Sequence, residues 1–131
     1  MIAAYASRAS IDPLGLYEAF LERETDASGT VVLHHGRVKR PGKLVADFSS
    51  VELKALAPDV DERLLALASD AAKAFALNQV LVVHRLGRIG AGDGVLLAIV
   101  SGATRDRCFA ACSWIVDEIK KGDFIELVEL P

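Results

Sequence analysis

The spacing of apolar and polar residues predicts three helices separated by strands. Asp12 and Pro13 form a helix start, because Asp can cap the first turn and Pro suits its first position. An apolar stripe then continues to Glu22 and ends before a polar, glycine-containing break. A second helix is predicted after Asp59, with Glu62 placed three residues later as in a capping box. The apolar residues that follow recur at helical spacing, so both segments are interpreted as amphipathic helices.

The third helix is predicted from about Thr104 to Lys121. Its apolar residues recur three or four positions apart, which favours one buried stripe made of Phe109, Cys112, Val116 and Ile119. On a helical wheel Lys120 borders this stripe, whereas Lys121 points more towards solvent. We therefore expect Lys120 to lie beside apolar side chains.

Five segments have the composition of strands. Pro41-Gly42 predicts a tight turn, so the segments on either side of it are expected to pair as a hairpin. A glycine-rich turn at 90–94 leads into a strand rather than a helix, which indicates a second hairpin and not a phosphate-binding loop. The predicted strands are Thr30–Val38, Lys43–Leu53, Gln79–Leu86, Val95–Ser101 and Phe124–Leu130.

This order of elements predicts an α+β fold. Strands joined by tight turns form antiparallel pairs, and the helices are expected to cover one face of the sheet in a two-layer domain. With 131 residues the chain is long enough for one core, so residues 1–131 are expected to form one domain. No apolar run approaches the roughly 20 residues of a membrane span, and the first residues lack a basic leader. A cytoplasmic protein with no membrane contact is therefore expected.

Charge narrows the class of ligand. The net charge is −3 and the pI is about 5.6, so nucleic acid is not the expected partner. Residues 34–43 nevertheless contain four cations and two histidines with no acid. In a regular strand Arg37 and Lys39 project to the same face and could hold one phosphate, but a solvated hairpin tip would show the same residues. A small anionic ligand is favoured over a polymer.

Histidines and cysteines give weaker signals. His84 and Arg85 point to opposite faces of a strand, and a histidine there is more often a hydrogen-bonded core residue than a ligand. His34 and His35 also alternate, and no Cys, Asp or Glu at ligand spacing accompanies them, so neither a metal site nor a cofactor is expected. Cys108 and Cys112 are four residues apart in the third helix, which favours buried packing over redox work.

Lys120 and Arg105 mark the two ends of the third helix. Lys120 is either a lysine that completes the helix C-terminus or an amine whose partial burial makes it a nucleophile or acid–base group. Arg105 lies on the same side, but fifteen residues at about 1.5 Å rise separate the two by roughly 22 Å. If both serve one site, Arg105 of one subunit must meet Lys120 of another, which predicts a dimer. The alternative is that Arg105 forms an ion pair with a neighbouring acid.

Several short motifs, taken in order, resemble the large, catalytic subunit of molybdopterin synthase, the MoaE family. Gly29-Thr-Val-Val-Leu with Gly36-Arg-Val-Lys39 resembles the family's first strand motif, and Val83-His-Arg-Leu-Gly87 with Gly92-Asp93 resembles the next. The helix that carries Thr104-Arg105, Phe109-Ala-Ala-Cys112, Asp117 and Lys120 resembles the family's Asp-x-x-Lys helix. The resemblance covers about Leu16 to Glu129.

This resemblance implies an α/β hammerhead fold, a homodimer, and two copies of a small ubiquitin-like subunit bound to each dimer. The partner's C-terminal Gly-Gly tail, as a thiocarboxylate, would supply two sulfurs to cyclic pyranopterin monophosphate and so form molybdopterin. Lys120 would be the essential lysine, and Arg105 would bind the substrate from the neighbouring subunit. The implied substrate-binding set is Arg37, Val38, Lys39, Thr104, Arg105, Leu127, Val128 and Glu129.

Three positions depart from the family pattern. The family's His-Arg pair is Thr104-Arg105 here, and its strand-end arginine is Lys39, which keeps the charge but lacks the bidentate fork. The family's second active-site lysine falls on or near Leu127. The leading hypothesis is a molybdopterin synthase large subunit, with sulfur transfer as its chemistry. The alternative is a catalytically weakened member that acts as a dimeric binding module for a ubiquitin-like partner.

Overall fold

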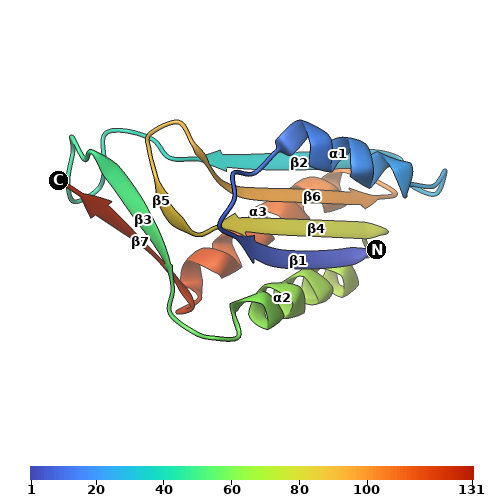
Figure 1. Ribbon diagram of the computed structural model, residues 1–131. Helices are drawn as coiled ribbons and strands as arrows, with labels where there is room; N and C mark the ends of the chain where they lie inside the picture. The colour runs from blue at the N-terminus through green and yellow to red at the C-terminus, as the bar shows by residue number, and fades with distance from the viewer.

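The computed structural model describes residues 1–131, which fold into three helices and two sheets (Figure 1). The helices are α1 (Pro13–Glu22), α2 (Val60–Ala74) and α3 (Arg105–Lys121). The strands are β1 (Ile2–Ser7), β2 (Thr30–Arg37), β3 (Ser50–Ala55), β4 (Gln79–Arg85), β5 (Gly87–Ile89), β6 (Gly94–Gly102) and β7 (Ile125–Leu130). All three predicted helices are present, and each begins within one residue of its predicted start. None of them is both long and apolar enough to cross a bilayer.

The larger sheet has the strand order β1-β4-β6-β2. β4 and β6 are antiparallel, as the sequence predicted, and β2 pairs antiparallel with β6 from Thr30 opposite Gly102 to Arg37 opposite Gly94. β1 pairs in parallel with β4, which is an exception to the expected antiparallel sheet. This order leaves one edge of β2 without a partner strand.

The smaller sheet has the order β5-β3-β7, and it corrects the predicted first hairpin. The segment Lys43–Leu53 does not pair with Thr30–Val38; its strand β3 begins at Ser50 and pairs with β5 and β7. The chain around Pro41-Gly42 is therefore a loop that crosses between sheets. The physical reason is burial: Val51 and Leu53 pack with Val38, Phe48 and Ile89 in a separate apolar cluster.

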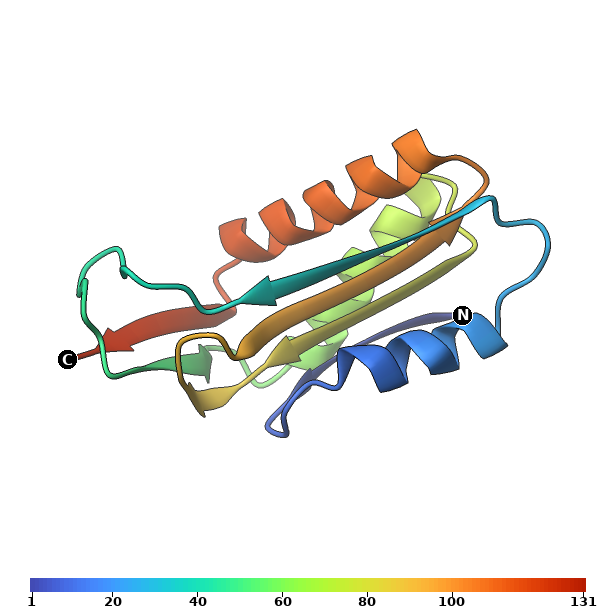
Figure 2. The same ribbon diagram turned by 90° about the horizontal axis from the view of Figure 1, so that it is seen from above.

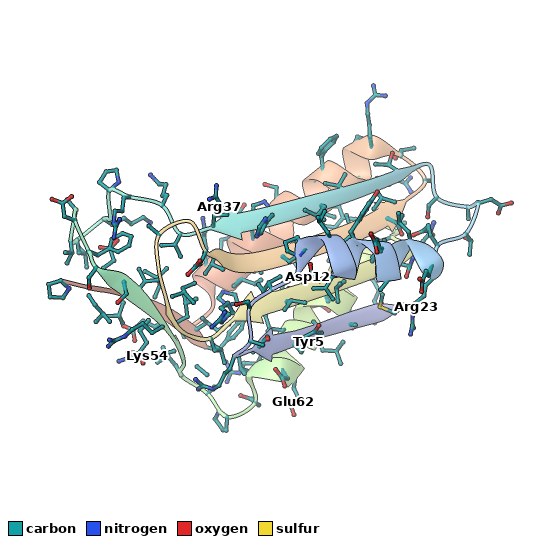
Figure 3. The ribbon with its side chains drawn as sticks, turned by 45° about the horizontal axis from the view of Figure 1, so that its top comes forward. Tyr5, Asp12, Arg23, Arg37, Lys54 and Glu62 are labelled. Carbon is teal, nitrogen blue, oxygen red and sulfur yellow. The ribbon has the colours of Figure 1, made fainter.

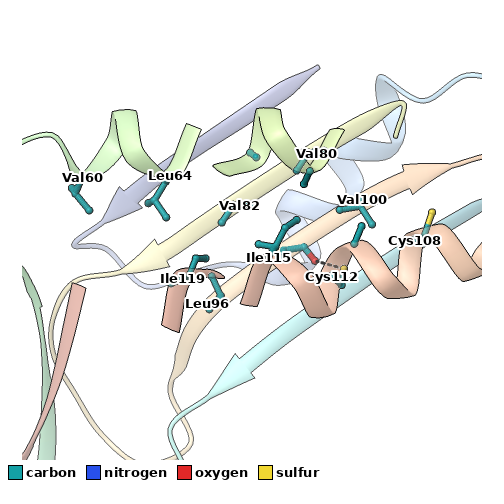
Figure 4. Close-up of a cluster of buried hydrophobic side chains, with 14 of the residues drawn as sticks. Val60, Leu64, Val80, Val82, Leu96, Val100, Cys108, Cys112, Ile115 and Ile119 are labelled. Atoms are coloured by element: carbon teal, nitrogen blue, oxygen red, sulfur yellow. Dashed lines mark hydrogen bonds between the residues drawn. The ribbon is translucent and has the colours of Figure 1, made fainter. Parts of the chain in front are cut away.

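The helices cover both faces of the larger sheet, not one face (Figure 2). α2 and α3 lie on one side, where they enclose the main core with Val80, Val82 and Val100 (Figure 4). α1 lies on the other side, where Phe20 packs in a cluster with Leu81, Val83, Leu97 and Ile99. The α+β class is confirmed, but α1 adds a third layer to the expected two.

The buried stripe of α3 differs from the predicted one. Its buried residues are Cys108, Ala111, Cys112, Ile115 and Ile119. Phe109 is 60% exposed and Val116 is only half-buried. The true stripe is centred roughly 100° round the helix from Phe109. Small side chains let the helix approach the sheet closely, and Cys108 Sγ lies 3.8 Å from the carbonyl oxygen of Thr30.

Two helix starts differ in their chemistry. The Asp12 carboxylate accepts a hydrogen bond from the Gly15 backbone N–H at 3.2 Å, as expected of an N-cap followed by Pro13. Asp59 makes no such capping bond, so the predicted capping box with Glu62 is wrong. The Asp59 carboxylate instead accepts from Arg63 Nε at 3.0 Å, one turn further along the helix. Both partners of that pair are half exposed, so it adds little stability.

Candidate functional site

A groove of about 670 Å³ lies where the two sheets meet. Its walls come from the end of β2, the 38–48 loop, the last turns of α3, and strands β3 and β7. This volume is within the range of small-molecule sites. Its cations are Arg37, Lys39, Lys43 and Lys120. The structure contains two ion pairs, Arg63–Asp59 and Lys121–Glu118, so all four groove cations lack a carboxylate partner.

Lys120 reaches the groove from the last turn of α3. It follows Ile119, which is buried in the main core, and Val116 lies one turn before it in the groove wall. The helix C-terminus favours a cation at this position. Lys120 itself is exposed, so its ammonium is available to a molecule in the groove. The neighbouring Lys121 instead pairs with Glu118 at 3.3 Å on the surface.

Arg37 is held at the end of β2 by the β5–β6 turn (Figure 3). Its Nε donates a hydrogen bond to the carbonyl oxygen of Gly92 at 3.1 Å. Val38 and this turn also exchange backbone bonds, from Val38 N–H to Asp93 O at 2.9 Å and from Gly92 N–H to Val38 O at 2.7 Å. Gly92 has a φ of +89°, a conformation that favours glycine. The end of β2 is therefore a rigid support for the cations of the groove.

The loop after β2 is anchored at both ends. The Glu129 carboxylate accepts backbone N–H bonds from Lys43 at 2.8 Å, Leu44 at 2.7 Å and Val45 at 2.9 Å. These bonds, that of Val45 first, hold the pKa of Glu129 below its usual range. Arg40 donates two hydrogen bonds to the carbonyl oxygen of Phe48, and its guanidinium lies 5.0 Å from the centre of the Phe48 ring. Lys39 and Lys43 are thus carried on a braced loop.

His84 forms part of the inner wall of the groove and is 6% exposed. Its Nδ1–H donates to the carbonyl oxygen of Arg85 at 2.9 Å, which leaves Nε2 as an acceptor. Burial lowers the pKa of His84, so the ring is neutral near pH 7. This agrees with the interpretation of His84 as a hydrogen-bonded core residue.

The structure brings six of the nine predicted site residues together around this groove: Arg37, Val38, Lys39, Leu127, Glu129 and Lys120. Val38 is buried in the wall, and Leu127 is 48% exposed on β7. Val128 is absent from the lining because alternate residues of a strand face opposite sides. Thr104 and Arg105 lie at the far end of α3, and Arg105 forms no ion pair.

Two polar groove residues, His34 and Lys43, were not in the predicted substrate-binding set, although both lie in the basic segment 34–43. His34 lies on β2 between Val32 and Gly36, and alternation along the strand places all three on the face that α3 covers. This alternation along the strand could have identified His34 as a residue that faces α3. Burial lowers the pKa of His34, and the charges of Lys120 and His35 lower it further.

A second, shallower groove of about 410 Å³ runs along the outer side of α3 beside the free edge of β2. Leu33, Phe109 and Val116 contribute its apolar wall, and His34 belongs to both grooves. Cys112 lies at its base, where burial raises the pKa of the thiol to about 12. Cys108 is also fully buried. The packing role predicted for both cysteines is confirmed.

Comparison with known proteins decides the family. The model of the MoaE protein family matches residues 7–122. This chain belongs to the MoaE family. It is 33% identical over 104 residues to the molybdopterin synthase catalytic subunit of Vibrio cholerae, which covers 79% of this chain and 67% of that protein. The catalytic subunit of Pyrococcus abyssi is 27% identical over 110 residues, covering 84% of this chain and 74% of the relative. The catalytic subunit of Nostoc is 32% identical over 111 residues, covering 82% of this chain and 66% of the relative.

Solved structures of the family share the fold. Molybdopterin synthase from Staphylococcus aureus superposes with a TM-score of 0.79 at 21% identity, covering 98% of this chain and 89% of that one. A complex of subunits 1 and 2 of molybdopterin-converting factor from Helicobacter pylori gives a TM-score of 0.77 at 14% identity. The match covers 96% of this chain and 83% of the chain in that complex. At these identities the likeness concerns the fold, and it confirms the hammerhead-like α+β architecture.

Proposed function

We propose that this MoaE-family chain is the catalytic subunit of a molybdopterin synthase. In this role it would transfer sulfur from the thiocarboxylated tail of a small ubiquitin-like subunit to cyclic pyranopterin monophosphate. The observation that carries the proposal is the groove between the sheets, in which Lys120 faces cations from the end of β2. Its relatives from Vibrio, Pyrococcus and Nostoc are molybdopterin synthase catalytic subunits.

The charge of the groove suits a phosphate-bearing substrate. Arg37, Lys39 and Lys43 lack carboxylate partners, and the one carboxylate in the lining, that of Glu129, is engaged by three backbone N–H groups. An anion would therefore meet the positive charges of Arg37 and Lys39, which pair with no acid, whereas the charge of Glu129 acts on Lys43. We assign the phosphate to the β2-end cations and the reacting end of the pterin to the side of Lys120.

Lys120 is the proposed catalytic residue. Its amine would act next to the incoming thiocarboxylate, as a base or as a transient acyl acceptor. The braced loop and the rigid β2 end would hold the substrate against it, which lowers the entropic part of the barrier.

We also propose that the chain works as a homodimer in which Arg105 and Thr104 of one subunit complete the groove of the other. Arg105 lies roughly 22 Å from Lys120 along α3, so the two cannot meet within one chain. The second groove supports this arrangement, because it runs between these two ends with Leu33 and Phe109 exposed beside the free edge of β2. An uncovered strand edge flanked by apolar side chains suits a second copy.

The alternative, a weakened binding module, rests on the missing second lysine near Leu127. The relatives do not favour this alternative, because they are molybdopterin synthase catalytic subunits. The Helicobacter complex of two converting-factor subunits supports a small-subunit partner under both hypotheses. Activity is therefore what distinguishes them.

The test is a reconstitution with thiocarboxylated small subunit and cyclic pyranopterin monophosphate, in which molybdopterin is followed as its fluorescent oxidised derivative. Wild type should form product, and Lys120→Ala should reduce the rate by about 10²-fold or more because the amine is lost. Lys121→Ala is the matched control, since Lys121 is adjacent but paired with Glu118 outside the groove. It should retain the wild-type rate.

Leu127→Lys gives a further arm of the same experiment. Leu127 lines the groove and is half exposed, so a lysine there can keep its ammonium in contact with solvent. A wild type that binds the small subunit but makes no product, and gains activity with Leu127→Lys, would establish the weakened module. An active wild type that is insensitive to Lys120→Ala would remove Lys120 from the mechanism.

A further inference from the structure

α3 lies along β2 in a regular register. Cys108 Sγ is 3.8 Å from the carbonyl oxygen of Thr30, and Cys112 Sγ is 4.0 Å from that of Val32. Four helical residues advance about 6 Å, and two strand residues advance about 6.6 Å, so the register continues with little drift. The next step brings Val116 over His34.

Lys120 follows one turn after Val116 and lines the same groove as His34. Side chains of a helix tilt towards its N-terminus, so the residue at position 120 covers the surface one turn before it. His34 points to the face of β2 that α3 covers, and both side chains line the same groove. After burial, the charge of Lys120 is the largest influence on the pKa of His34.

We infer that His34 is a positioning residue for Lys120, whose neutral imidazole accepts a hydrogen bond from the ammonium and directs it into the groove when substrate is bound. This inference rests on the proposed role of Lys120. A neutral ring suits the task because it offers an acceptor nitrogen without a negative charge that would hold the lysine in an ion pair.

The surroundings of His34 keep its ring neutral near pH 7. Burial and the charge on Lys120 lower its pKa, and His35 on the same strand acts in the same direction. The other titratable groups around it are Cys112 and Asp117 from α3, His84 from β4, Arg37 and Lys39 from the end of β2, and Lys43 and Glu129 across the groove. Cations outnumber acids in this set. When the pH falls through the pKa of His34, the ring gains a charge beside Lys120 and loses its acceptor.

The pairing can be tested without activity, by NMR titration of the three histidine rings in wild type and in Lys120→Gln. Assignment would come from single His→Gln variants. We expect the His34 pKa to lie below the ordinary value of 6.5 in wild type and to rise when the lysine charge is removed. His84 provides the internal control and should not move. An unchanged His34 pKa in Lys120→Gln would overturn the pairing.

The positioning role can be tested by the pH dependence of the reconstituted reaction. His34→Gln keeps an acceptor but cannot titrate, so it should retain most of kcat at pH 8 and lose the fall in rate on the acid side. His34→Phe removes the acceptor and should lower kcat about tenfold with little change in KM, since a misplaced amine affects the reacting step. His35→Gln is the matched control, because that ring projects to the opposite face of β2.

Equal rates for His34→Phe and wild type, with the acid limb intact, would refute the role. Circular dichroism melts of each variant would separate a folding defect from a kinetic one. If wild type forms no product, the proposed function has failed, and the titration alone then decides whether His34 and Lys120 are paired.

Discussion

Subunit complementation tests the proposed dimer most directly. Two inactive variants, Arg105→Ala and Lys120→Ala, are each purified with a different affinity tag and then mixed so that subunits exchange. Each homodimer lacks one group in both of its sites. In a hybrid dimer, one site combines the intact Lys120 of one subunit with the intact Arg105 of the other. The second site of that hybrid lacks both groups.

The expected magnitude follows from the geometry. Because roughly 22 Å separates the two residues along α3, a site built within one subunit cannot contain both. Random exchange makes about half of the dimers hybrids, and one site in two is intact in each, so about one quarter of wild-type activity should return. A hybrid isolated by both tags should reach about half. The assay is molybdopterin formation with thiocarboxylated small subunit, measured at equal total site concentration.

The reciprocal mixture removes the remaining ambiguity. Wild type mixed with the double variant Arg105→Ala/Lys120→Ala gives hybrids in which every site lacks one group if the site is shared. The same hybrids keep one complete site if the groove is built within one subunit. An inactive first hybrid together with a half-active reciprocal hybrid would therefore refute a shared site.

Three further predictions concern stability and reactivity. Ile115→Ala should lower the free energy of unfolding by about 2–5 kcal/mol in denaturant titrations, because Ile115 is fully buried between α3 and the sheet; a loss below about 1 kcal/mol would contradict that packing. For Glu24, burial alone would raise the pKa, but hydrogen bonds that include those donated by Ser28 and Gln79 lower it to about 2. Its stabilising effect is thus complete above pH 4.5 and is lost as the pH falls towards 2. Glu24→Gln should cost about 1–2 kcal/mol at pH 7, since solvent still screens this half-buried group, and the difference should vanish near pH 2. Cys112 should resist thiol reagents at pH 8 in the folded protein and react after unfolding; rapid labelling of the native state would contradict its raised pKa.

Local signals in the sequence predicted the helices well. The Asp12-Pro13 start has its own cap, and α3 ends within its last lysines, because capping and charge preferences act over one turn. The rotation of α3 about its own axis was harder to predict from the sequence. On a helical wheel, one side of α3 has the small residues Cys108 and Ala111, and another side has the bulkier Phe109. Hydrophobicity alone predicts that the bulkier side is buried. The sheet selected the small side because close approach needs small side chains.

Strand partners could not be predicted from local pattern. Pro41-Gly42 has the residues of a hairpin turn, yet β2 pairs with residues of β6 that lie 57 to 72 positions later, and β3 pairs with β7. The turn therefore sits within a crossing loop. Turn chemistry specifies how the chain bends, whereas the partner is set by which apolar faces are buried together. Placement of Glu129 depends on this pairing, because β7 carries its carboxylate to the backbone of residues 43–45.

The charges of the groove bear on the position near Leu127, where the family pattern places a second active-site lysine. The groove already holds four cations, and its one carboxylate is bonded to the loop. A further ammonium at Leu127 would add repulsion of about 1 kcal/mol or more for each cation close to it, whereas a neutral ring at His34 adds a polar partner without charge. His34 on β2 and Leu127 on β7 would then both limit the positive charge around Lys120. This reasoning implies that the effects of Leu127→Lys and His34→Phe on kcat should be non-additive in a double-mutant cycle, because each changes how Lys120 is held. Strictly additive effects would contradict it.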